Sequence, residues 1–198
     1  MMKNVITISR EFGSGGRTIG KRVAELLGYA FYDSEIVNQV AERSGFSSAF
    51  IEECGEYAGA RSSLLFSLAT ASQYTAGGMS VQDKLYLEQE NIIRELADKG
   101  GCVIVGRCAD YILRERKDAL HVFICSDMES RAKRIVECYG KKDKSPEKRL
   151  AEKDQKRRVY YRNYTGREWG AMKNYSLCLN SAALGLETCA QIIVQAAK

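Results

Sequence analysis

Short apolar runs alternate with stretches of helical periodicity along most of this chain. Apolar runs predict strands at Val5–Ile8, Tyr29–Tyr32, Cys102–Val105, Leu120–Cys125 and Tyr175–Leu179. Helical spacing or capping signals predict helices over residues 19–27, 34–44, 83–99, 111–114, 126–136 and 186–197. Gly28 and Gly45 are the expected stops of the first two helices, and Ser126-x-x-Glu129 is a capping-box signal for the fifth. This alternation predicts an α/β fold, a doubly wound parallel sheet of about five strands with right-handed crossovers.

The first predicted strand runs into a glycine-rich turn, which is followed by a helix. Such a turn directs backbone N–H groups and the start of a helix toward an anion, and glycine lets the backbone approach a phosphate closely. The alternative is a turn that serves only the tight packing of strand and helix. We favour a phosphate-binding loop, in which ATP would be held by Gly13, Ser14, Gly15, Gly16, Arg17 and Thr18.

The loop departs from the common phosphate-loop motif, G-x-x-x-x-G-K-[ST]. With Thr18 as the second residue after the lysine position, where a further hydroxyl can stand, Gly16 takes the lysine position and Arg10 that of the first glycine. A second frame would supply Lys21, but it places this lysine inside the predicted helix, where a solvated surface position is expected. The motif therefore lacks its usual cation.

A cation near the transferring phosphate is needed in a site that excludes water. Arg17 is the nearest candidate in sequence, with Arg10 as the second. The hydroxyl of Thr18 would help to bind Mg²⁺. The predicted cofactors are therefore ATP and Mg²⁺.

Charge adds a second feature. The 198 residues carry a formal net charge of +5, and a strongly basic run extends from Lys141 to Arg167. A basic chain of this kind suits anionic partners such as nucleotides or nucleic acid. Three tyrosines, Tyr160, Tyr161 and Tyr164, interleave with this run; we interpret them as packing it against the core rather than as an RNA-binding patch.

The cysteine pattern and the apolar runs bear on location. Seven cysteines are scattered without a C-x-x-C pair, and several lie in apolar runs, which predicts buried, reduced thiols in a cytoplasmic protein. No apolar run approaches the roughly 18 residues of a membrane helix, so no membrane partner is expected. The length fits a single α/β domain, residues 1–198.

Four stretches carry a resemblance to a known family: ITISREFGSGGRTIGKRVAELLGYAFYD, VIVGRCADYIL, EKDQKRRVYYRNYTGREWG and MKNYSLCLNS. With these the chain resembles the nucleoside monophosphate kinases, most closely a lysine-free branch of the cytidylate kinase-like group. The resemblance implies a P-loop kinase-like fold. It further implies that residues 34–99 form an inserted helical acceptor-binding lobe and that residues 140–167 form a basic lid with a lid helix.

The resemblance also suggests roles for single residues. Asp33, after the second strand, and Arg107, after the third, would bind the acceptor, although the aspartate that normally follows this arginine is replaced by Cys108. Asp154 and Arg157 match an aspartate and an arginine of the family's lid helix. Asp154 is accordingly assigned to acceptor binding.

Together these observations predict ATP-dependent phosphoryl transfer to a nucleoside monophosphate, with CMP or dCMP first. Arg17, Arg157 and Arg158 would be the catalytic cations. Two alternatives stay open, a nucleotide-binding sensor without turnover and a basic RNA-binding protein. Nucleotides are the expected partners, nucleic acid is disfavoured, and a homodimer is left open.

Overall fold

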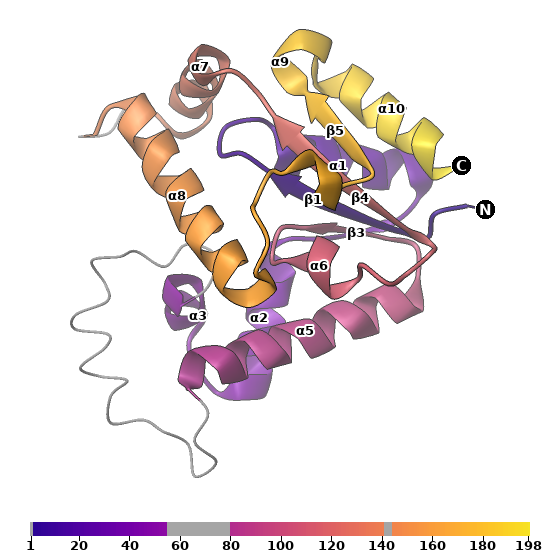
Figure 1. Ribbon diagram of the computed structural model, residues 1–198, viewed down its shortest axis with the longest axis vertical. Coiled ribbons are helices and arrows are strands. Elements are labelled where there is room, and N and C mark those ends of the chain that lie inside the picture. Colours follow the sequence, from indigo (N-terminus) through magenta and orange to yellow (C-terminus); the bar gives the residue numbers. More distant parts are fainter. Residues whose placement is uncertain (1, 55–79, 141–143) are drawn as a thin grey trace.

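A computed structural model describes residues 2–54, 80–140 and 144–198 of the chain. Its centre is a five-stranded sheet in the order β2-β3-β1-β4-β5, with all neighbouring strands parallel (Figure 1). The strands are β1 (Val5–Arg10), β2 (Ala30–Tyr32), β3 (Cys102–Val105), β4 (Ala119–Cys125) and β5 (Leu177–Asn180). The predicted doubly wound parallel sheet is confirmed.

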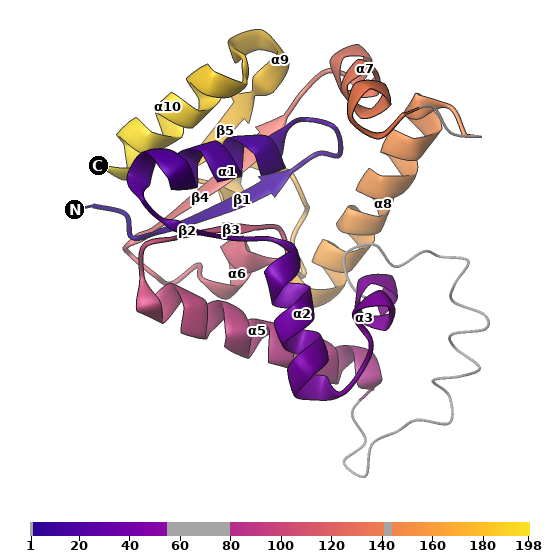
Figure 2. The same cartoon turned by 180° about the vertical axis from the view of Figure 1, so that it is seen from behind.

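Helices cover both faces of the sheet. One face is covered by α1 (Gly16–Leu27) and α10 (Leu186–Ala197), which lie side by side in Figure 2. Ile6 and Ile8 of β1 share a buried cluster with Ile19 of α1 and Ile193 of α10. Full burial of β1 explains why its residues read as a continuous apolar run.

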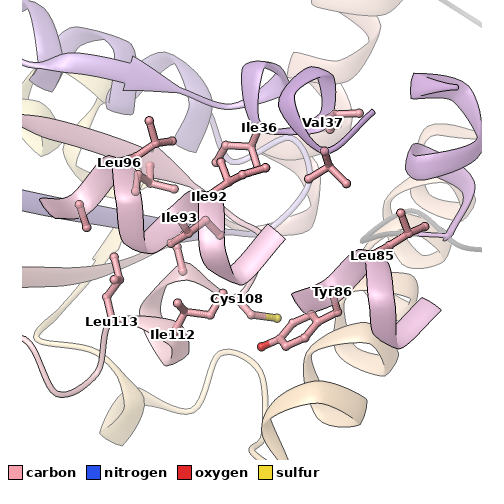
Figure 3. Packing of buried hydrophobic residues seen from close by; sticks show 14 of the residues in the cluster. Ile36, Val37, Leu85, Tyr86, Ile92, Ile93, Leu96, Cys108, Ile112 and Leu113 are labelled. Carbon is pink, nitrogen blue, oxygen red and sulfur yellow. The ribbon is translucent and has the colours of Figure 1, made fainter. Parts of the chain in front are cut away.

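The opposite face is covered by α5 (Val81–Lys99) and α6 (Ala109–Ile112), with α2 (Ser34–Ser44) packed against α5 (Figure 3). Ile36 of α2, Ile92 of α5 and Ile104 of β3 belong to one buried cluster. The predicted lobe 34–99 therefore shares its core with the sheet. It also contains α3 (Ser48–Cys54), whereas residues 55–79 lie outside the described part.

The remaining elements follow β4. They are α7 (Met128–Tyr139), α8 (Pro146–Thr165), a short 3-10 helix η1 (Met172–Asn174) and α9 (Ser181–Leu184). Within the predicted lid 140–167, α8 forms a single helix that ends at Gly166. Tyr160 and Tyr161 of α8 are buried in the same cluster as α5, which confirms that these tyrosines pack the helix against the core.

Two local predictions need correction. The sequence places a capping box at Ser126, but α7 is capped by Asp127, whose Oδ1 accepts a hydrogen bond of 2.8 Å from Ser130 N. Ser126 N instead donates to Glu11 Oε2 at 3.0 Å. Burial is also wrong for two cysteines, because Cys138 and Cys178 are exposed. Cys102, Cys108, Cys125, Cys138, Cys178 and Cys189, the cysteines whose side chains the structure describes, are free thiols.

Within residues 2–54, 80–140 and 144–198, no helix combines the length and the apolar character that crossing a membrane requires.

His121 of β4 supplies a pH-dependence prediction. Its Nδ1 lies 2.8 Å from Thr7 Oγ1, and burial lowers the pKa of the imidazole from 6.5 to about 4. As the pH falls, His121 therefore binds a proton near pH 6.5 in the unfolded chain but only near pH 4 in the folded protein. Stability should fall as the pH drops from about 6.5 to about 4, by on the order of 3 kcal/mol for this group.

The measurement is urea unfolding of wild type and His121→Gln between pH 7 and pH 4. The difference in unfolding free energy between the two proteins isolates His121 from the carboxylates that also titrate in this range. A difference that stays constant with pH would show that the folded protein protonates His121 normally.

Candidate functional site

The glycine turn links the end of β1 to the start of α1. Gly13 and Gly15 adopt φ values of 81° and 80°, a left-handed conformation that favours glycine. With Gly15 as N-cap, α1 begins at Gly16, three residues before the first apolar helix position that the sequence shows at Ile19. The first amides of α1 therefore belong to the turn itself.

Side chains of α7 and α10 pack tightly against the turn. A Cβ on Gly13 would lie 2.9 Å from Ile135 Cγ2, and a Cβ on Gly15 would lie 2.6 Å from Leu186 Cδ2. Both glycines are thus required for packing as well as for backbone conformation. A cradle with no side chains leaves the backbone accessible to an anion.

Ser14 anchors the turn to its surroundings. Its Oγ donates to the carbonyl oxygens of Glu11 (2.9 Å) and Ile124 (3.1 Å), and its own carbonyl accepts from Ser181 Oγ at 2.6 Å. The Ser14 side chain is fully buried and turned into the protein. Among the predicted ATP-binding residues, Ser14 therefore holds the loop in place from below.

A cavity of about 290 Å³ opens above the turn, at the carboxyl end of β1. Gly13, Gly15, Gly16, Arg17 and Thr18 line it, together with Arg10, Glu11, Phe12, Asp33, Arg134, Cys138, Tyr139 and Arg157. The structure thus brings together most of the predicted phosphate loop, Asp33 from the end of β2 and Arg157 from α8.

The sequence reasoning missed the wall that α7 contributes. Arg131, Arg134 and Cys138 follow one another at helical spacings of three and four, which places them on one side of α7. Arg134 reaches over the turn, with its Cζ 3.5 Å from the position of a Cβ on Gly15. The available signal was this spacing, directly after the strand that runs beside β1.

The two departures from the phosphate-loop motif are sterically coupled. A Cβ on Gly16 would lie 2.5 Å from Arg10 Cβ and 2.9 Å from Arg10 Cγ. The aliphatic part of the Arg10 side chain therefore fills the space that a side chain at position 16 would need. With arginine at position 10, a lysine does not fit at position 16.

Arg17 and Asp33, expected in different half-sites, form an ion pair. Arg17 Nε lies 2.7 Å from Asp33 Oδ2, and the Arg17 side chain is 65% exposed. Arg10, in contrast, is only 6% exposed. Of these two arginines, Arg10 is the one that packing holds in a fixed place.

Asp154 of α8 connects the helix to the loop. Its Oδ1 accepts a hydrogen bond from Phe12 N at 2.7 Å, and its Oδ2 accepts from Arg131 Nη1 at 2.6 Å. One turn further, Arg157 Nη1 donates to the carbonyl oxygen of Arg10 at 3.1 Å. Asp154 and Arg157 are each 3% exposed, so α8 is locked onto the loop by buried polar contacts.

Arg107 and Arg158 do not line the loop cavity. Arg107 lines a small cavity of about 10 Å³ beside α5 and α8, with Gln89 and Tyr160. It follows Gly106 and precedes Cys108, and all three residues have φ values between 56° and 74°. Left-handed backbone at non-glycine residues is costly and typical of functional turns. Arg158 lines a third cavity.

Asp110 lies close to the sheet end but is enclosed. Its carboxylate accepts hydrogen bonds from Ser9 Oγ (3.2 Å) and Tyr161 Oη (2.6 Å). Burial raises the pKa of this carboxyl above its usual value, against the opposite effect of the two hydrogen bonds. This network joins the end of β1 to α8.

The loop cavity also has the chemistry to hold magnesium with a nucleotide. Mg²⁺ prefers oxygen ligands and is usually shared between one or two protein oxygens and substrate phosphates. Thr18, Glu11 and Asp33 are among the residues that line the cavity, so a hydroxyl and carboxylates, the oxygen donor types that suit this cation, are present there.

A parallel sheet in this strand order, with a glycine cradle between its first strand and first helix, defines a P-loop kinase fold. Residues 5–183 match the cytidylate kinase-like family, and the chain belongs to that family. The kinase family and the fold together support a nucleotide-binding phosphotransferase.

Individual relatives are distant. The chain is 25% identical over 181 residues to a cytidylate kinase of Pyrococcus horikoshii, covering 91% of this chain and 81% of that protein. It is 22% identical over 191 residues to a cytidylate kinase of Ignicoccus hospitalis, covering 96% of each.

Solved structures agree on the fold. An uncharacterized protein from Eubacterium ventriosum superposes with a TM-score of 0.73 at 26% identity, covering 98% of this chain and 97% of that one. Shikimate kinase from Acinetobacter baumannii, solved with shikimate, gives a TM-score of 0.55 at 18% identity, covering 98% and 92%.

Proposed function

We propose that this protein transfers the γ-phosphoryl group of ATP to a nucleoside monophosphate, with CMP and dCMP as the first acceptors to test. The observation that carries the proposal is the cavity above the glycine turn, which is lined by arginines from four elements: Arg10, Arg17, Arg134 and Arg157. The family and the names of the two relatives support a cytidine nucleotide as acceptor.

In this proposal the turn from Gly13 to Thr18 binds the phosphates of ATP through its backbone amides. Thr18 would hold Mg²⁺, which offsets phosphate charge when bound. Phosphoryl transfer demands alignment and fixed positive charge more than covalent work by the protein. Arg134 and Arg157, placed by α7 and α8, would stabilise the charge on the transferring group.

Arg10 takes the part of the missing lysine. Its side chain occupies the space above Gly16, the lysine position of the motif. Arg17 is the alternative, but its exposed side chain is paired with Asp33. That ion pair would have to open or rearrange before Arg17 could serve a phosphate, whereas Arg10 is held by packing.

The lobe formed by residues 34–99 would bind the acceptor, and α8, within residues 140–167, would act as the lid. Asp33 lies at the entrance, where it can steer Arg17 or the acceptor. Asp154 would act through position, since its contacts fix Arg131 and the loop amide of Phe12. The scattered cysteines, none of them in a C-x-x-C pair, fit a reducing, cytoplasmic setting.

The decisive experiment is a phosphotransfer screen with Mg·ATP against all ribo- and deoxyribonucleoside monophosphates. Production of ADP that depends on one acceptor, together with the acceptor's diphosphate, would establish the activity. ADP production without an acceptor product would indicate hydrolysis only.

Arg107 gives a prediction for the acceptor half. Because its planar guanidinium suits a phosphate and it stands on a strained turn after β3, Arg107→Ala should raise the acceptor KM about tenfold or more and leave ATP binding nearly unchanged. Steady-state kinetics with each substrate varied in turn measures this. Weakened ATP binding with an unchanged acceptor KM would reverse the two half-sites.

A nucleotide-binding protein without turnover is the second candidate. Glycine at the lysine position favours it. Saturable ATP binding, measured by calorimetry, with no transfer to any acceptor in the screen would select this function.

A further inference from the structure

The cavity lined by Arg158 lies away from the phosphate loop, between the C-terminal half of α8 and the segment that follows it. Its volume is about 520 Å³, and its lining residues are Arg158, Arg162, Gly166, Arg167, Glu168 and Trp169. None of these residues lines the loop cavity. The proposed reaction assigns no role to this space.

The lining is strongly cationic. Arg158, Arg162 and Arg167 line the cavity with one acidic residue, Glu168, and the Cζ of Arg167 also lies 5.1 Å from the centre of the Tyr111 ring. Many other arginines of the protein, such as Arg43 and Arg116, are paired with carboxylates. Across the described ranges, no ion pair involves any of the three arginines of this cavity. Positive charges around one small space repel one another, and a bound anion would relieve that repulsion.

The cavity wall is fixed by backbone and aromatic contacts. Gly166 N donates to Arg162 O at 2.9 Å, and Arg167 N donates to Thr165 Oγ1 at 3.0 Å. Trp169 packs edge-on against Phe123 of β4, with ring centroids 5.4 Å apart and an interplanar angle of 82°. The site is therefore built on rigid elements, as ligand sites generally are.

Trp169 adds an aromatic surface to the charge. Its side of the cavity also carries Arg158, whose Cζ lies 5.6 Å from the centre of the indole ring. A planar ring and a phosphate can be bound together where an indole and guanidinium groups are neighbours. Volumes of roughly 300–1,000 Å³ are usual for pockets that enclose small molecules.

We propose that this arginine–tryptophan cavity binds a nucleoside phosphate at a second site, distinct from the phosphate-loop cavity. The base lies against Trp169, and the phosphate is bound by Arg158, Arg162 and Arg167. Six residues around a space of about 520 Å³ suit a mononucleotide better than a nucleic-acid strand, which needs a longer groove. Asp154 and Arg157 of the same helix contact the phosphate loop. A ligand that shifts α8 would therefore also shift these contacts.

Trp169 is the single tryptophan of the chain, so its fluorescence reports on this cavity. The test is carried out in Thr18→Glu, which closes the loop cavity to phosphates. Thr18 is the third residue of α1, where a carboxylate is well tolerated by the helix, so this variant should fold. Titration with AMP should change the fluorescence of Trp169 saturably, while adenosine or inorganic phosphate at equal ionic strength should act at least tenfold more weakly.

Arg162→Glu, added to Thr18→Glu, should weaken AMP binding at least tenfold. Lys99→Glu is the matched control, because Lys99 is likewise an exposed basic residue in the last turn of a helix, α5. It should leave the affinity within about twofold. Circular dichroism confirms that each variant is folded.

The proposal would be overturned by the absence of a saturable response to AMP or by an equal response to inorganic phosphate. Equal losses of AMP affinity in Arg162→Glu and Lys99→Glu would also overturn it. Tighter binding of a single-stranded oligonucleotide with a steep salt dependence would also overturn it, and would assign the surface to nucleic acid. The test does not depend on turnover, so failure of the phosphotransfer screen leaves it intact.

Discussion

Arg10→Ala should slow phosphoryl transfer by about 10²–10³-fold, the loss expected when one preorganised charge is removed from an active site. The aliphatic part of Arg10 lies over Gly16, where the common motif carries its lysine. The proposed reaction therefore depends on Arg10 for the charge that this lysine normally supplies. The measurement is kcat and KM for both substrates, with thermal unfolding as a check on folding.

Arg17→Ala is the matched comparison. Arg17 is exposed and paired with Asp33, so its removal should slow transfer less than the removal of Arg10. If Arg17→Ala loses about 10²-fold or more while Arg10→Ala turns over normally, the cation is Arg17, as the sequence first suggests. Normal turnover in both variants would place the charge on Arg134 or Arg157.

A rescue variant sharpens the test. Gly16→Lys alone should destabilise the protein, because its Cβ would lie 2.5 Å from Arg10 Cβ. The double variant Arg10→Gly/Gly16→Lys restores the first glycine and the lysine of the common motif and removes this clash, so it should recover much of the activity that Arg10→Gly loses. Failure of the double variant to exceed Arg10→Gly, with both folded, would contradict the exchange of roles between the two positions.

Asp154→Ala should lower the free energy of unfolding by about 3–5 kcal/mol, the usual consequence of removing one partner of a buried ion pair. The change leaves the guanidinium of Arg131 buried without its carboxylate, and it removes the acceptor of Phe12 N. Denaturant unfolding at neutral pH measures the loss. Glu152→Ala removes an exposed carboxylate of the same helix, which pairs with Lys144 just before the helix, and should cost less than about 1 kcal/mol.

A structural and a catalytic role of Asp154 can be separated. Arg131→Met/Asp154→Leu replaces the ion pair by apolar side chains, which commonly restores stability. If positioning is the role of Asp154, this double variant should be more stable than Asp154→Ala and still transfer phosphate slowly, because the loop amide of Phe12 has lost its partner. Losses of the same size in Asp154→Ala and Glu152→Ala would contradict the buried clamp.

Local pattern was sufficient for most of the secondary structure. The parallel strands are short and apolar, the predicted α10 agrees with the observed Leu186–Ala197, and Gly28 and Gly45 end α1 and α2 as expected. Glycine spacing likewise located the turn between β1 and α1. These features follow from the periodicity of side chains and from the conformational freedom of glycine, which neighbouring residues in the sequence reveal.

The errors at Ser126 and at the start of α1 also have local causes. Asp127 supplies the cap of α7 in place of Ser126, and the left-handed Gly15 lets the helix begin before its first apolar residue. In both places several polar or glycine residues in a row can each serve as the cap. Which residue does so depends on where the incoming strand directs the backbone.

The sequence by itself determined the strand–turn–helix order, the glycine cradle, the basic character of α8 and the missing lysine. Only the tertiary structure decided which cations surround the cradle. Arg10 fills the space above Gly16, Arg134 arrives from α7, and Arg158 faces Trp169 instead of the loop. The physical reason is that the direction of a long side chain is set by the elements packed around it, which lie far away in sequence and meet only when the sheet and its helices assemble.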